Sequence, residues 1–209
     1  MRIAVINEES ACLRNKDIIE ALSGYSHEVF NVGMTGEKNE PAYSYIHTAF
    51  MTAMLLKVEA VDFVIGGCGT GEGYMLSANQ YPNVYCGLIY DPLEAWLFVQ
   101  INAGHAVSLA LNKCYGWAAE ENLKLIFDAL FNSPVGAGYP CYRKEAQKKF
   151  RIELEKVSTA THKNFADIIN SLDKNIMLKC AESEKFLKLI SESKGDIAIR
   201  DLYLKQISM

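Results

Sequence analysis

A cysteine stands in the middle of a glycine-rich turn that follows an apolar run. Residues 62–73 read DFVIGGCGTGEG, so Cys68 comes at the end of a predicted buried strand, and residues 74–79 are typical of the helix that follows. Glycine lets the backbone of such a turn approach a ligand closely, and the free amides at the start of the helix favour a negative charge. Because a thiolate is stabilised in that environment, the pattern indicates that Cys68 is a base or a nucleophile.

Two common nucleotide-binding turns fit this loop poorly. The loop lacks the Lys followed by Ser or Thr that ends a P-loop. The strand before it is the third in the chain, and no acidic residue closes a second strand at the distance that a dinucleotide site requires. Glycine-rich turns that serve only packing are also common, and the cysteine is the feature that favours a catalytic site.

Composition narrows the class of protein. The chain has 209 residues, half of them hydrophobic, and a formal charge of -4, so it offers no electrostatic case for binding nucleic acid or an anionic membrane. We expect neither a signal peptide nor a membrane-spanning segment, and therefore a cytoplasmic protein. The six cysteines form no Cys-x-x-Cys pair and the four histidines show no ligand spacing, so the sequence predicts free thiols and no metal site.

Strand and helix patterns alternate along the first two thirds of the chain. Strands are predicted at residues 2–7, 29–32, 62–67, 84–89 and 105–109, and helices at 15–22, 41–58, 93–101 and 117–131. This alternation predicts an α/β fold with a five-stranded parallel sheet and helices on both faces. Ligands of such sheets bind beyond the carboxyl ends of the strands, here the turns after Asn7, Gly67, Ile89 and Leu109.

The last third of the chain differs in composition from the rest. Residues 132–140 read NSPVGAGYP, which is typical of a linker, and amphipathic helices are predicted at 143–172, 175–193 and 196–207. We therefore divide the chain into a sheet domain, residues 1–133, and a linker with a helical extension, residues 134–209. The apolar stripe of the extension must pack on its own sheet domain or on a second subunit.

About the first 143 residues contain several motifs in the same order as one known family. In these motifs the chain resembles the type B ribose-5-phosphate isomerases, a family that includes the subunits of galactose-6-phosphate isomerase. The most specific is the Cys-Gly-Thr-Gly loop with Ser-Ala-Asn downstream of it. The others are the segments at residues 2–11, 41–43, 91–92 and 100–102. The resemblance implies a Rossmann-like three-layer sandwich.

The resemblance also implies a reaction. Members of the family interconvert aldose and ketose phosphates through a cis-enediolate, without a metal or other cofactor. Cys68 would then move the proton between C1 and C2, Thr70 would hydrogen-bond sugar oxygens, and amides from Gly69 through Gly71 to Gly73 would meet the developing oxyanion.

Further binding residues are implied by position within the family pattern. Tyr43 and Asn102 match positions near the sugar. Arg143 lies roughly where relatives keep arginines that bind the phosphate in the neighbouring subunit's site. The resemblance thus implies a homodimer or a homotetramer with sites shared between subunits.

This chain departs from the family pattern at two places. Relatives carry a ring-opening histidine where this chain has Ile101, and Asp-His where it has Glu8 and Glu9. A carboxylate near a phosphate repels it, so either the substrate binds in another way or it differs from ribose 5-phosphate. His105 is a candidate substitute for the histidine, or else a residue that opens the fifth strand. Glu72 is a candidate second acid or base, or else a surface carboxylate at a helix start.

Two other functions remain open at this point. The first is a sugar-phosphate sensor that kept the fold and lost the chemistry, which the absence of the ring-opening histidine suggests. The second is a flavodoxin-like protein that binds a nucleotide through the same turn. Binding without turnover would indicate the sensor, and a copurified chromophore would indicate the nucleotide binder.

Overall fold

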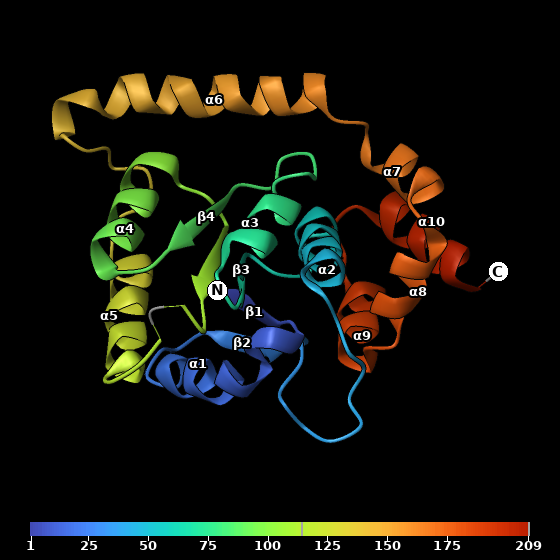
Figure 1. Cartoon of the computed structure of the whole chain (residues 1–209). Helices are drawn as coiled ribbons and strands as arrows, with labels where there is room; N and C mark the ends of the chain where they lie inside the picture. The colour runs from blue at the N-terminus through green and yellow to red at the C-terminus, as the bar shows by residue number, and fades with distance from the viewer. Residues whose placement is uncertain (114, 209) are drawn as a thin grey trace.

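The computed structural model describes residues 1–113 and 115–208, and its centre is a parallel sheet (Figure 1). The strands are β1 (Arg2–Asn7), β2 (Glu28–Asn31), β3 (Phe63–Cys68), β4 (Cys86–Ile89) and β5 (Ala106–Ala110). Their order across the sheet is β2-β1-β3-β5-β4, and each neighbouring pair is parallel. The predicted α/β fold with a five-stranded parallel sheet is therefore confirmed.

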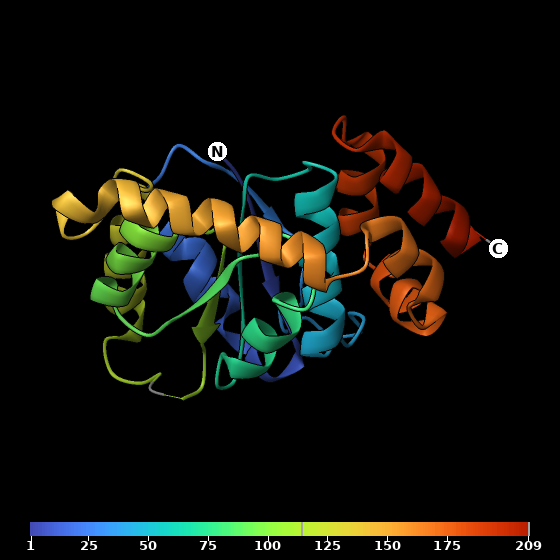
Figure 2. The same cartoon turned by 90° about the horizontal axis from the view of Figure 1, so that it is seen from above.

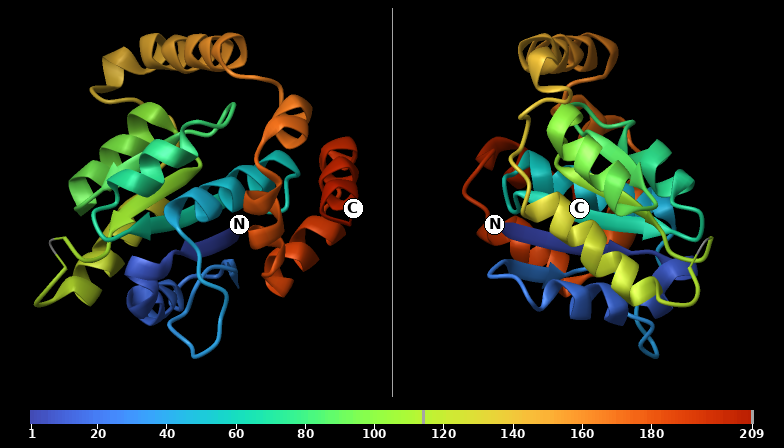
Figure 3. Two further views of the ribbon diagram at one scale, coloured as in Figure 1. Left: turned by 45° about the vertical axis from the view of Figure 1, so that its right-hand side comes forward. Right: turned by 90° about the vertical axis from the view of Figure 1, so that its left-hand side faces the viewer.

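Helices cover both faces of the sheet, as Figure 3 shows. Helices α1 (Asn15–Leu22), α4 (Pro92–Leu97) and α5 (Ala119–Phe131) lie on one face, and α2 (Tyr45–Lys57) and α3 (Glu72–Ala78) lie on the other. The strands alternate accordingly, since Ile3 and Val5 pack toward the first group of helices while Ala4 and Ile6 pack toward the second. This is the predicted three-layer arrangement.

The helical extension contains more helices than the sequence predicts. It comprises α6 (Lys144–Thr161), α7 (Phe165–Ser171), α8 (Lys174–Ala181), α9 (Glu184–Glu192) and α10 (Ile197–Ser208). The predicted first and second helices are each divided in two, because polar side chains cap new helices inside them. Asn164 accepts a hydrogen bond from the Asp167 amide at 2.9 Å, and Ser183 accepts one from the Phe186 amide at 3.3 Å.

Helices α7 to α10 pack against the outer side of α2, and α6 crosses the molecule to reach them (Figures 1 and 2). The extension thus packs on its own chain, which was one of the two predicted possibilities. Helix α2 is buried at every position from Thr48 to Leu55, more than two full turns, because the sheet lies on one side of it and the extension on the other.

Helix α2 begins later than predicted. The sequence places its start at Pro41, but the structure starts it after Ser44, whose hydroxyl and backbone form a reciprocal capping box with His47. The His47 Nδ1 atom accepts a hydrogen bond from the Ser44 amide at 3.0 Å. A serine that satisfies the first free amides fixes a helix start more strongly than a proline upstream of it.

Two further features bear on the class of protein. No helix among the described residues combines the length and the apolar character needed to cross a membrane. The thiols of Cys12, Cys68, Cys86, Cys141 and Cys180 are free, and Cys114 lies outside the described residues.

Candidate active site

Cys68 is the last residue of β3, at the carboxyl edge of the sheet. It pairs with Ala110 at the end of β5, and only 6% of its surface is exposed. Its Sγ atom lies 3.9 Å from the Thr70 hydroxyl oxygen. The carbonyl of Cys68 accepts hydrogen bonds from the amides of Gly71 at 3.2 Å and Leu111 at 3.0 Å, so the backbone around the thiol is held on both sides.

Glycine is required in the loop after Cys68 for steric reasons. Gly71 has a φ of +79°, and a Cβ atom there would lie 2.5 Å from the Leu88 side chain. A Cβ atom on Gly73 would lie 3.1 Å from the ring of Tyr45. The turn into α3 therefore requires glycine at position 71 and leaves little room for a side chain at position 73, where the ring of Tyr45 lies close.

Only some of the loop amides remain available for a ligand. The Gly69 amide donates to the Ser10 hydroxyl at 2.9 Å, the Gly71 amide donates to the Cys68 carbonyl, and the Glu72 amide donates to the Thr70 hydroxyl at 3.3 Å. Within the described chain, the amides of Thr70, Gly73 and Tyr74 have no acceptor. This corrects the prediction that Gly69 and Gly71 donate to an oxyanion, because their N–H groups already hold the loop together.

The two acidic residues after β1 differ in their surroundings. Glu8 is 5% exposed, and its carboxylate accepts a hydrogen bond from the Ser10 hydroxyl. Glu9 is exposed, and its amide donates to the Tyr43 carbonyl at 2.9 Å. Of the two, Glu8 is therefore the carboxylate that the fold fixes beside the Cys68 loop.

Lys113 is a cation of this crevice that the sequence reasoning missed. Its Nζ atom lies 3.3 Å from the Tyr90 hydroxyl and 3.6 Å from the carboxylate of Glu72, and the ammonium group also lies over the Tyr90 ring. The Tyr90 hydroxyl and, to a lesser extent, Glu72 raise the pKa of Lys113. Its position just after β5, at a carboxyl strand end, was the signal that could have identified it.

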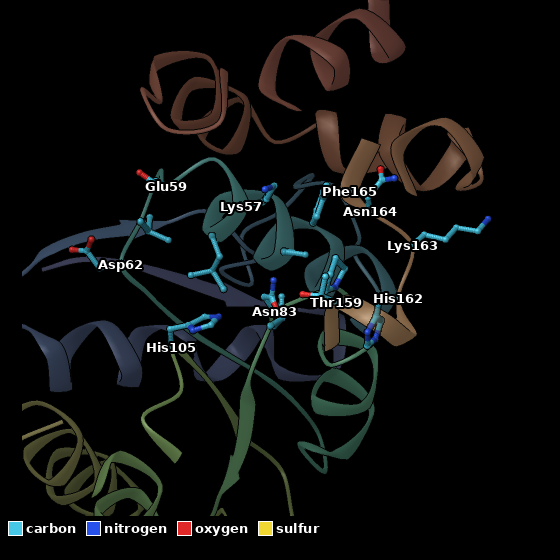
Figure 4. Close-up of a pocket in the computed structure, with 15 residues that line it drawn as sticks. Lys57, Glu59, Asp62, Asn83, His105, Thr159, His162, Lys163, Asn164 and Phe165 are labelled. Carbon is cyan, nitrogen blue, oxygen red and sulfur yellow. The ribbon is translucent and has the colours of Figure 1, made fainter. Parts of the chain in front are cut away.

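His105 lies at the opposite edge of the sheet from Cys68. It precedes β5, and its carbonyl accepts a hydrogen bond from the Val64 amide near the start of β3. Its ring contacts the ring of Tyr85 and lines a pocket of about 580 Å³ together with Asn83 and His162 (Figure 4). The structure therefore does not place His105 beside Cys68 of the same chain, because parallel strands place everything before β5 at the amino edge.

Replacing His105 with glutamine should leave kcat and KM unchanged and reduce the sensitivity of folding to acid. Burial lowers the pKa of His105 in the folded protein. At pH values below about 6.5 the unfolded chain therefore binds a proton that the folded protein does not, and stability falls as the pH falls. Urea unfolding at about pH 7.5 and about pH 5.5 should show a smaller loss of stability for the variant than for the wild type. A large loss of kcat would instead support the predicted catalytic role of His105.

The carboxyl edge thus brings together a thiol, a hydroxyl, unpaired amides, a fixed carboxylate and a cation. A family model described as Ribose/Galactose Isomerase matches residues 3–135, which include this whole set. The chain belongs to this family. It is accordingly an isomerase that interconverts aldoses and ketoses. No curated protein sequence matches it.

Solved structures of isomerases resemble the chain over different lengths. A 4-deoxy-L-threo-5-hexosulose-uronate ketol-isomerase, crystallised with a tartrate, is 34% identical, with a TM-score of 0.93, and the match covers 100% of this chain and 99% of that one. A ribose-5-phosphate isomerase from Vibrio parahaemolyticus is 36% identical, with a TM-score of 0.94 and 99% coverage of both chains. One from Thermotoga maritima is 21% identical, with a TM-score of 0.60, and covers 74% of this chain and 97% of its own.

Two residues that the family pattern implies lie away from Cys68 of the same chain. Asn102 ends a π-helical turn, Phe98–Asn102, and lines a cavity of about 340 Å³ with Tyr85 and Cys86 at the start of β4. Arg143 is exposed at the end of a short 3-10 helix, Cys141–Arg143, directly before α6. Neither lies at the carboxyl edge of this isomerase's own sheet.

The side chain of Tyr43 is buried beside the extension. It is 2% exposed, its hydroxyl has no hydrogen-bond partner within the described chain, and it lines a cavity of about 200 Å³ with residues 182–185 of the extension. Burial raises its pKa. The structure thus places the Tyr43 hydroxyl against the extension, and its predicted contact with the sugar stays a prediction.

The described residues contain no group of three or more His, Cys, Asp or Glu side chains placed to hold a metal ion.

Proposed function

We propose that the isomerase moves a proton between C1 and C2 of its substrate through a cis-enediolate, with Cys68 as the base. The Cys68 thiolate takes the proton from C2, and the electron pair of the broken C–H bond forms the C1–C2 double bond as the C1 carbonyl becomes an oxyanion. Return of the proton from sulfur to C1, with transfer of the hydroxyl proton from O2 to O1, yields the ketose. Thr70 and Glu72 are the candidates for moving the proton between the two oxygens.

The unpaired amides support this proposal. Those of Thr70, Gly73 and Tyr74 belong to the loop that carries Cys68, and a fixed N–H group stabilises an oxyanion without having to reorganise. Glu8, held by Ser10, can accept a hydrogen bond from a sugar hydroxyl.

We propose an open-chain sugar acid as the substrate, and the observation that carries this is Ile101 in place of the family's ring-opening histidine. The name of the 34% identical ketol-isomerase describes a uronate with a ketone at C5 and no hydroxyl at C4. A five-membered sugar ring needs the C4 hydroxyl and a six-membered ring needs one at C5, so such a molecule has no ring to open. An enzyme for it has no use for that histidine.

Ribose 5-phosphate is the second candidate substrate. The Vibrio parahaemolyticus structure, 36% identical over nearly the whole chain, bears that activity in its name. Lys113 at the crevice and Arg143 from a second subunit would be the cations available to a phosphate. Against this candidate stand Glu8 and Glu9, because carboxylates repel a doubly charged phosphate.

Incorporation of deuterium at C2 distinguishes the candidates. Each compound is incubated with the enzyme in deuterated water and followed by NMR, using 4-deoxy-5-hexosulose uronate, ribose 5-phosphate and other pentose and hexose phosphates. Incorporation of deuterium into the uronate alone supports the proposed substrate. Incorporation into a sugar phosphate alone contradicts it and supports the second candidate. Binding of any of them to folded protein without exchange would overturn the isomerase mechanism in favour of a sensor.

Replacing Lys113 with methionine should raise KM about tenfold or more and change kcat much less. Both candidate substrates carry an anionic group, and the Lys113 ammonium lies 3.6 Å from the carboxylate of Glu72 in the Cys68 loop. Steady-state kinetics at low and high salt measure the effect, which salt should reduce in the wild type. Lys124→Met, on the exposed face of α5, is the matched control. Equal KM values for the two variants would remove Lys113 from the binding site.

We further propose a cytoplasmic homodimer or homotetramer in which Asn102 and Arg143 of one subunit complete the site of another. Both residues lie away from Cys68 of their own chain, and α6 beside them exposes Phe150, Leu154 and Val157. Free thiols suit a reducing compartment. Light scattering should give the mass of two or four chains, and a fully active monomer would contradict the shared site.

A further inference from the structure

The hydroxyl of Ser10 joins two groups of the candidate site. It donates a hydrogen bond to the Glu8 carboxylate and accepts one from the Gly69 amide at 2.9 Å. Ser10 follows β1 and Gly69 follows β3, so a single hydroxyl connects the carboxyl ends of two neighbouring strands. Neither the fold nor the reaction as described above requires this bridge.

The peptide after Cys68 is fixed from the other side as well. The Gly69 carbonyl accepts hydrogen bonds from the amides of Asn112 at 3.0 Å and Lys113 at 2.8 Å, both of which follow β5. The Asn112 side chain donates to the Ser10 carbonyl at 2.6 Å. Residues from three strand ends thus close a ring of hydrogen bonds around Gly69.

We infer that Ser10 is a positioning residue of the isomerase, which sets the orientation of both Cys68 and Glu8. The peptide unit that Ser10 and Asn112 hold is covalently attached to Cys68, so it restricts where the thiol points. The same hydroxyl holds one oxygen of the Glu8 carboxylate, and the other oxygen has no partner in the described chain. That second oxygen is free to accept a substrate hydroxyl. The inference rests on the proposed function, because it gives Ser10 a role in the same proton transfer.

Loss of the Ser10 hydroxyl should affect turnover more than binding. A displacement of about 1 Å of a reacting group can lower a rate by about 100-fold, while groups that bind the rest of the substrate are unaffected. We therefore expect Ser10→Ala to lower kcat by about tenfold to 100-fold with little change in KM. Ser10→Thr keeps the hydroxyl, and because Ser10 is exposed there is room for the added methyl group, so this variant should recover most of kcat.

The experiment combines kinetics with amide hydrogen exchange measured by NMR. Removal of the acceptor should make the Gly69 amide of Ser10→Ala exchange at least about tenfold faster than in the wild type, while amides in the middle of β3 are unchanged. Ser191→Ala, an exposed serine on α9, is the matched control for the loss of a hydroxyl. Thermal melting of each variant verifies that the protein is folded.

Wild-type kcat in Ser10→Ala would overturn the inference, even if the Gly69 amide of the variant exchanges faster. Reduced kcat in Ser10→Ala with recovery in Ser10→Thr supports it. Absence of turnover in the wild type itself is a different result, since it contradicts the proposed isomerase rather than the role of Ser10 within it.

Discussion

Replacing Cys68 with alanine is expected to lower kcat by about 10²- to 10⁴-fold and to stop the incorporation of deuterium at C2, while the substrate still binds. The reason is that the thiol stands at the start of the glycine loop, where its Sγ atom lies 3.9 Å from the Thr70 hydroxyl oxygen. Without the base no enediolate forms, because the C2 proton has nowhere to go. Serine at the same position should be nearly as inactive, since a hydroxyl ionises far less readily than a thiol.

The measurement is NMR in deuterated water, combined with calorimetry of substrate binding to each variant. Cys180→Ala is the matched control, because Cys180 is another buried thiol, located on α8 and facing the carbonyl of His47. It should lose stability and keep kcat, which is the opposite pattern. If Cys68→Ala still exchanges the C2 proton at the wild-type rate, Glu72 becomes the first candidate for the base.

Replacing Phe186 with alanine is expected to destabilise the whole protein by about 3–5 kcal/mol. Phe186 lies on α9 in the extension and is fully buried. Its ring packs edge-on against Tyr203, which in turn packs against Phe50 of α2 at 5.7 Å. The three rings form a continuous core between the extension and the sheet domain, so the cavity left by alanine weakens both together.

Urea unfolding observed by two probes tests this expectation. Trp96 and Trp117 both belong to the first 133 residues, so their fluorescence reports the sheet domain, whereas far-ultraviolet circular dichroism includes the extension. Both signals should shift to lower urea by the same amount in a single transition. Leu178→Ala, at a partly exposed position on α8, should shift them much less. Two separated transitions would instead show that the extension unfolds on its own.

Local patterns were sufficient to predict the sheet. Buried parallel strands have apolar residues on both faces, and the glycine turn after β3 has no other common interpretation than a strand-to-helix connection. The corrections arise where one local signal competes with another. Pro41 can begin a helix, but the Ser44 and His47 pair does so with two hydrogen bonds. The apolar pattern of the extension predicts three long amphipathic helices. The structure describes five, because Asn164 and Ser183 cap new helices within two of them.

The candidate site was predictable only as far as sequence motifs reach. Cys68 and Thr70 stand in one loop, and their roles remain predictions for the experiments above. Lys113 and Ser10 belong to other loops and have no motif, so only the pairing of β1, β3 and β5 reveals that they are neighbours of Cys68. His105 was considered because it lies four positions after Ile101, but closeness in sequence does not decide which edge of the sheet a residue occupies.

Helix α2 has no face that water can wet along residues 48–55. Substitutions in α2 and in the extension therefore depend on one another, although the two parts are far apart in the sequence. A polar substitution on the outer side of α2 would place an unpaired group against the extension, and a change of size on α8 or α9 would leave a void against α2. Loss or exchange of the extension would therefore expose the outer side of α2 to water unless residues near position 50 changed as well.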